Sequence, residues 1–146
     1  MQPRIHIWNI LFSLFFLCLL VLGLSWLASH DRFPMGVSVW GFTLMTLAIF
    51  RLVRLTCYDV ITQFVRDWFV SARENSFLGT VGTLLNCPWC VGLWYAFVVV
   101  FFYYATPYAW PVILVLALAG AASFIQIFAN LLGWVAEHKK LTVQDM

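Results

Sequence analysis

Two cysteines separated by two residues, Cys87 and Cys90, are the side chains whose type and spacing most directly offer chemistry. Pro88 lies between them at the start of a long apolar run, and proline is best tolerated in the first turn of a helix. With Cys87 as the N-cap, Cys90 is expected at the third helical position. Both thiols then face the positive end of the helix dipole, which favours thiolate. A redox-active pair is one interpretation, and small packing residues at a helix start are another.

A zinc site is a third interpretation of the same thiols. Cys57 ends one apolar run at a similar expected depth, and His138 follows another. Three thiolates and one imidazole suit tetrahedral zinc, although a single C-x-x-C is weak support because zinc ribbons usually present a second pair. The metal candidates are therefore Cys57, Cys87, Cys90 and His138, and the sequence identifies no cofactor.

Charged side chains at the same expected depth form a second candidate cluster. Arg51 and Arg54 are three residues apart and share one helix face. They can extend to the lipid headgroups, or they can point inward, toward Asp59 or toward a polar strip on a later helix. That strip has helical spacing and consists of Ala119, Ser123, Gln126, Asn130 and Gly133, ending near Glu137. Small residues and amides at such spacing are typical of close helix packing with interhelical hydrogen bonds.

The elements that hold these residues are apolar enough for a membrane. The chain has 146 residues, of which 64% are hydrophobic and 10% charged. A bilayer core of about 30 Å needs roughly 20 helical residues, and apolar runs at about 5–28, 35–58, 87–105 and 112–135 can meet that need. We predict an all-α protein, a single integral membrane domain over residues 1–146 with a four-helix transmembrane bundle.

The middle connection is expected to carry an amphipathic helix at about residues 59–70. Its apolar positions are Val60, Ile61, Phe64, Val65, Trp68 and Phe69. Such a segment can lie along the cytoplasmic membrane surface, or it can prolong the second helix and pack on a neighbour. Residues 71–86 contain Gly79 and Gly82 and are expected to return irregularly to the membrane.

The distribution of positive charge predicts the orientation. The N-terminus, middle connection and tail contain Arg4, Arg51, Arg54, Arg66, Arg73, Lys139 and Lys140, whereas the two short connections contain only Arg32. Positive residues near helix ends stay in the cytoplasm, so both termini are expected there. The first apolar run is too long for a cleavable signal peptide. A net charge of +2 gives no basic stripe for nucleic acid.

A family resemblance rests on Arg51-Leu52-Val53-Arg54-Leu55, Asp59, Arg66 and Cys87-Pro88-Trp89-Cys90-Val91-Gly92-Leu93-Trp94. This series resembles a domain-of-unknown-function family of small bacterial and phage membrane proteins that includes YjcA-type sporulation proteins. The similarity covers about residues 44–105. It implies a multi-pass protein of the bacterial inner membrane whose shared core contains Arg51, Arg54, Asp59, Cys87, Cys90, Gly92 and Trp94. It implies no biochemical activity.

The sequence shows no nucleophile-base pair, phosphate loop or acid pair that would name a reaction. We therefore expect a non-enzymatic interaction or accessory subunit of a membrane assembly, surrounded by lipid and bound to a membrane protein or a second copy of itself. One alternative is a membrane thiol oxidoreductase that uses Cys87 and Cys90, with a quinone as its partner. Another is a small pore or holin-like protein, although a second polar strip for its lining is missing.

Overall fold

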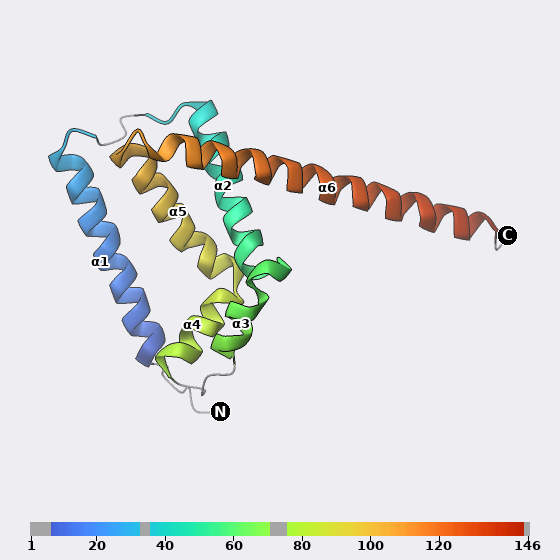
Figure 1. Cartoon of the computed structure of the whole chain (residues 1–146), viewed down its shortest axis with the longest axis horizontal. Helices are drawn as coiled ribbons and strands as arrows, with labels where there is room; N and C mark the ends of the chain where they lie inside the picture. Colours follow the sequence, from blue (N-terminus) through green and yellow to red (C-terminus); the bar gives the residue numbers. More distant parts are fainter. Residues whose placement is uncertain (1–6, 33–35, 71–75, 145–146) are drawn as a thin grey trace.

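The computed structural model describes residues 7–32, 36–70 and 76–144, and all regular elements within these ranges are helical (Figure 1). They are α1 (Ile7–Ser29), α2 (Val39–Cys57), the 3-10 turn η1 (Val60–Thr62), α3 (Gln63–Val70), α4 (Phe77–Leu85), α5 (Pro88–Ala105) and α6 (Ala109–Gln144). In this part of the chain, α1, α2, α5 and the Ala109–His138 stretch of α6 are long and apolar enough to cross a membrane. The all-α class is confirmed, and the four helices indicate a multi-pass membrane protein.

Two spanning helices differ in extent from the sequence prediction. α2 begins at Val39 because the Ser38 hydroxyl accepts a hydrogen bond from the Gly41 N–H at 3.1 Å and caps the helix. α6 begins at Ala109 and continues to Gln144, beyond the expected range of 112–135. Pro111 lies in its first turn, where the missing N–H breaks no helical bond. Residues 5, 6 and 35 of the expected helices lie outside the described residues.

The middle connection is more helical than expected. After α2 the chain extends at Asp59, with φ −73° and ψ 143°, so η1 and α3 form a helical segment separate from α2. α4 occupies residues that the glycines suggested would be irregular, and the Ser76 hydroxyl caps it by accepting from the Gly79 N–H at 3.0 Å. A Cβ at Gly82 would lie 2.9 Å from the Phe69 carbonyl oxygen. Glycine is therefore needed there for α4 to pack against α3.

The buried core lies where α2, α5 and α6 meet. Its buried residues are Leu44, Met45, Ala48, Val99, Ile113 and Ala117. At Gly120 of α6 the backbone of α2 comes so close that an added Cβ would overlap the Leu47 carbonyl oxygen. α1 packs on the other side of α5 through aromatic rings, with the centroids of Phe16 and Trp94 separated by 4.9 Å. Helices of a membrane protein pack in this way through small residues and shape complementarity.

α6 leaves the other helices after it crosses α2, and its C-terminal half extends away from them (Figure 1). Its apolar stretch has 30 residues, Ala109–His138. At about 1.5 Å per residue this stretch is about 45 Å long, whereas a bilayer core is about 30 Å thick. A bilayer accommodates an apolar helix longer than its core through tilting or kinking of the helix or through local thickening of the bilayer.

Candidate functional site

The dithiol has the local geometry expected from its sequence. Cys87 is the N-cap of α5, Pro88 is the first helical residue, and the Cys87 sulfur accepts a hydrogen bond from the Cys90 N–H at 3.4 Å. Both thiols are free, and Cys90 is exposed. The Cys90 side chain, followed by the Cys90 backbone N–H, stabilises the Cys87 thiolate and lowers the pKa of Cys87. The pair is therefore accessible and has one activated sulfur.

The four metal candidates are not brought together. Cys57 is within electrostatic reach of Cys87. His138 lies in the part of α6 that extends away from α2, and its ring centroid is 6.4 Å from that of Trp134. Within residues 7–32, 36–70 and 76–144, no three His, Cys, Asp or Glu side chains are grouped closely enough to hold a metal ion. The structure therefore does not group the four candidate zinc ligands, and the zinc site stays a prediction from the sequence.

Arg51 points into the protein and connects three elements. Its Nη2 atom lies 3.0 Å from the Asp59 carboxylate at the start of η1, and its Nη1 donates to the Ser123 hydroxyl of α6 at 3.1 Å. The Arg51 and Asp59 side chains are 25% and 24% exposed. Of the two predicted placements for Arg51, the structure has the inward one. We call Arg51, Asp59 and Ser123 the arginine joint.

Arg54 takes no part in the arginine joint. Its guanidinium carbon lies 5.7 Å from the centroid of the Tyr58 ring, at the end of α2. This distance fits a cation–π contact. The two arginines therefore have different surroundings although they share one helix face.

Arg66 of α3 caps the C-terminal end of α2. Its Nη1 donates to the carbonyl oxygens of Thr56 at 2.8 Å and Asp59 at 3.2 Å. The Thr62 hydroxyl donates to the carbonyl oxygens of Leu55 and Asp59. The last carbonyls of a helix lack internal donors and carry partial negative charge, so a guanidinium stabilises them. The cluster at this end of α2 fixes where η1 and α3 begin.

Two polar contacts between helices were missed from the sequence. The hydroxyls of Thr56 in α2 and Tyr95 in α5 are 2.6 Å apart. Arg32, after α1, donates to the Ala105 carbonyl oxygen at the end of α5 at 2.6 Å. The only sequence feature that pointed to a role for Arg32 is that the two short connections contain no other positive residue. Thr56 and Tyr95 are 39 residues apart, and no local pattern links them.

The polar strip of α6 is divided. Ser123 reaches the arginine joint, but Gln126 and Asn130 are exposed, and Gln126 Nε2 donates to Asn130 Oδ1 at 3.0 Å. The stripe of α6 that faces α2 is a different one, formed by Ile113, Ala117, Gly120 and Phe124. Gly133 has no atom within 4 Å of an added Cβ. The strip is therefore mostly outside the packed core.

The two motif residues after the dithiol serve packing. A Cβ at Gly92 would lie 3.7 Å from a Val53 methyl group, so α5 passes close to α2 there. Trp94 packs its indole against Phe12, Phe15 and Phe16 of α1. Together they place the N-terminal half of α5 between α1 and α2.

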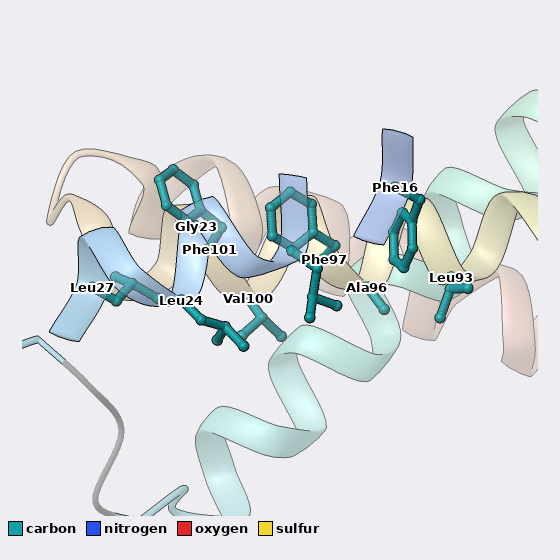
Figure 2. A pocket seen from close by; sticks show the side chains of 10 residues that line it. Phe16, Gly23, Leu24, Leu27, Leu93, Ala96, Phe97, Val100 and Phe101 are labelled. Carbon is teal, nitrogen blue, oxygen red and sulfur yellow. The ribbon is translucent and has the colours of Figure 1, made fainter. Parts of the chain in front are cut away.

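A pocket of about 250 Å³ lies between α1 and α5 (Figure 2). Its lining side chains are apolar and include Phe16, Leu27, Leu93, Phe97 and Phe101. Leu93 is one helical turn after Cys90, so the pocket begins close to the dithiol. The pocket itself offers no polar group for catalysis.

Comparisons with known proteins identify relatives of this chain. The sequence profile of a family described as Protein of unknown function (DUF1360) matches residues 71–129. UPF0713 protein YngL of Bacillus subtilis (strain 168) is 33% identical over 102 residues, covering 62% of this chain and 78% of YngL. Sporulation protein YjcA of the same organism is 33% identical over 121 residues, covering 70% of this chain and 100% of YjcA. No solved structure matches.

The matched region includes α4, α5 and the first half of α6. It therefore reaches further toward the C-terminus than the expected similarity over residues 44–105, which left the fourth helix out. The contacts of α6 with α2 at Gly120 and Ser123 both lie within this region. From the two relatives and the profile, the chain belongs to the DUF1360 family of YjcA-type proteins.

Proposed function

We propose that this chain is a non-catalytic accessory subunit of a membrane assembly in the bacterial inner membrane, with both termini in the cytoplasm. The observation that carries the proposal is that its polar side chains bind other parts of the same chain. Arg51 binds both Asp59 and Ser123, and Arg66 and Arg32 bind helix-end carbonyls. These groups hold helices in place instead of converging on a cavity where a substrate can react.

The outer surface of the chain suits an interaction subunit. Large apolar side chains on η1 and α3 are exposed, including Val60, Phe64 and Trp68. An amphipathic helix with this exposed face lies naturally along a membrane surface or against another subunit. The relative named as a sporulation protein adds a context, and we extend the proposal to an assembly used in sporulating cells.

Purification of the full chain from its native membrane in a mild detergent tests the proposal. We expect a second membrane protein to elute with it in a fixed ratio. The Arg51→Leu variant should lose that protein together with its own stability, whereas an Arg54→Leu control should keep it. Elution of the chain with no protein in fixed ratio would contradict the proposal.

A second candidate function is that of a membrane thiol oxidoreductase. It is favoured by the lowered pKa of Cys87 together with the apolar pocket that begins at Leu93. Oxidation of the two thiols to a disulfide releases two electrons and two protons, and a quinone whose tail occupies the pocket takes up both to become a quinol. Quinol formation by the reduced protein, lost in Cys90→Ala, would support this function over the first.

A further inference from the structure

One exposed face of α6 is polar although it lies within an apolar helix. We call the residues Gln126, Asn130, Gly133 and Glu137 the amide face. They recur every three or four residues, so they lie along one side of the helix. This side differs from the α2-facing stripe that contains Gly120 and Phe124. All four lie inside the apolar span Ala109–His138, where lipid would surround an isolated helix.

Lipid is a poor partner for this face. The Gln126–Asn130 bond is the hydrogen bond that these amides make among the described residues, and it uses one donor and one acceptor. The Asn130 amino group and the Gln126 carbonyl oxygen keep further capacity. Polar groups in hydrocarbon are costly unless they are hydrogen-bonded, so protein is the better cover. Gly133 adds a place where another backbone can come close, because an added Cβ there meets nothing within 4 Å.

We propose that the amide face binds the same face of a second copy of this chain, with the two α6 helices parallel around a two-fold axis normal to the membrane. A carboxamide both donates and accepts, so Asn130 can pair with Asn130 of an identical helix. Copies inserted in one orientation place identical residues opposite each other around such an axis. A single buried asparagine fixes the register of paired helices in the same way.

The course of α6 supports this choice of partner. The C-terminal half of α6 extends away from α1, α2 and α5 (Figure 1), and Gln126 and Asn130 are exposed. The two parallel α6 helices can then lie side by side near Asn130 while their own bundles stay apart. The inference goes beyond the proposed function, because the pairing involves two copies of this chain and no other protein.

Disulfide cross-linking in native membranes tests the pairing. In a chain whose Cys18, Cys57, Cys87 and Cys90 are replaced by alanine, single cysteines are introduced as Gly133→Cys and Glu137→Cys, which lie on the amide face and keep both amides. Matched controls are Phe128→Cys and Leu132→Cys, which lie at similar depth on another side of α6 and replace side chains that are each 55% exposed. After oxidation we expect a band of twice the chain mass for the first two variants and the monomer for the controls.

The contribution of the amides is measured in the Gly133→Cys background. Adding Gln126→Leu and Asn130→Leu should reduce the cross-linked fraction at least about threefold, since hydrogen bonds between membrane helices are worth about 0.6–2 kcal/mol. Adding Phe128→Leu instead should leave the fraction unchanged. Gly133→Cys keeps both amides, so it still tests the pairing if the double leucine variant fails to fold.

Three outcomes would overturn the inference. The first is cross-linking at Phe128→Cys or Leu132→Cys equal to that at Gly133→Cys. The second is the absence of a homotypic band in both amide-face variants. The third is a cross-link from Gly133→Cys to a different protein, which would refute self-association while supporting the accessory-subunit proposal. Two differently tagged copies that co-purify, together with the expected band, would establish the pairing.

Discussion

Replacing Gly120 by alanine should disrupt the contact between α2 and α6. The new Cβ would overlap the Leu47 carbonyl oxygen and lie 3.0 Å from the Leu47 carbonyl carbon. Non-bonded carbons normally lie about 3.5–4.0 Å apart. The two helices must therefore separate by about 0.5–1 Å, because the obstructing atoms belong to the backbone and cannot rotate away.

The separation has two energetic consequences. Overpacking of this kind costs about 1–3 kcal/mol. The 3.1 Å bond from Arg51 to Ser123 also lies across the same contact, and a hydrogen bond from a charged group contributes about 1.5–3 kcal/mol. Alanine regains about 0.5–1 kcal/mol because it favours a helix more than glycine does. We expect the free energy of unfolding to fall by about 1.5–5.5 kcal/mol.

Chemical unfolding of the purified protein in detergent, followed by tryptophan fluorescence, measures this change. Gly92→Ala and Gly133→Ala are matched controls, since an added Cβ meets a Val53 methyl group at 3.7 Å in the first case and nothing within 4 Å in the second. Both controls should keep the wild-type stability within about 1 kcal/mol or exceed it. A Gly120→Ala variant as stable as these controls would show that α2 and α6 do not cross at this point.

Three further predictions concern the polar groups. Arg51→Leu should lower the free energy of unfolding by at least about 1.5 kcal/mol more than Arg54→Leu, because only Arg51 donates to both a carboxylate and a hydroxyl; equal losses in the same unfolding assay would refute this. The rate of Cys87 alkylation should reach half its maximum at a lower pH than for an unperturbed cysteine, because the lowered pKa of Cys87 keeps the thiolate populated to lower pH, and Cys90→Ala should move that midpoint upward. An unchanged midpoint in Cys90→Ala would contradict the assigned cause. A reporter active only outside the cytoplasm should work when inserted beside Tyr108 and fail when fused after the last residue, whereas activity at the C-terminus would reverse the proposed orientation.

The features that the sequence predicts well are local ones. The dithiol at the start of α5 follows from the preference of proline for the first helical turn, and capping needs only neighbouring residues. The four long helices follow from length and hydropathy alone. α4 was missed because Gly79 and Gly82 were interpreted as helix breakers. The reason for Gly82 is the close Phe69 backbone of α3, which no local pattern reveals.

The candidate sites depended on relations between distant helices. Arg51 points inward because it binds both Asp59, which is near it in the sequence, and Ser123, 72 residues away. The zinc hypothesis grouped the three cysteines and His138 by their expected depth in the membrane. Residues at the same depth can still lie far apart in the membrane plane, and the course of α6 separates His138 from the thiols. The periodicity of α6 correctly placed Gln126 and Asn130 on one face, but it could not say that α2 packs on a different face, through Gly120.

The length of α6 makes the chain responsive to the thickness of its membrane. A helix with 30 apolar residues meets a thin bilayer by leaning further and a thick one by standing more upright. α2 has 19 residues and little freedom to follow, so a change in thickness acts on the angle between the two helices. That angle is set at Gly120, where the backbones touch. Lipid composition therefore acts on the same contact that carries the arginine joint, and the chain should be sorted among membrane regions by their thickness.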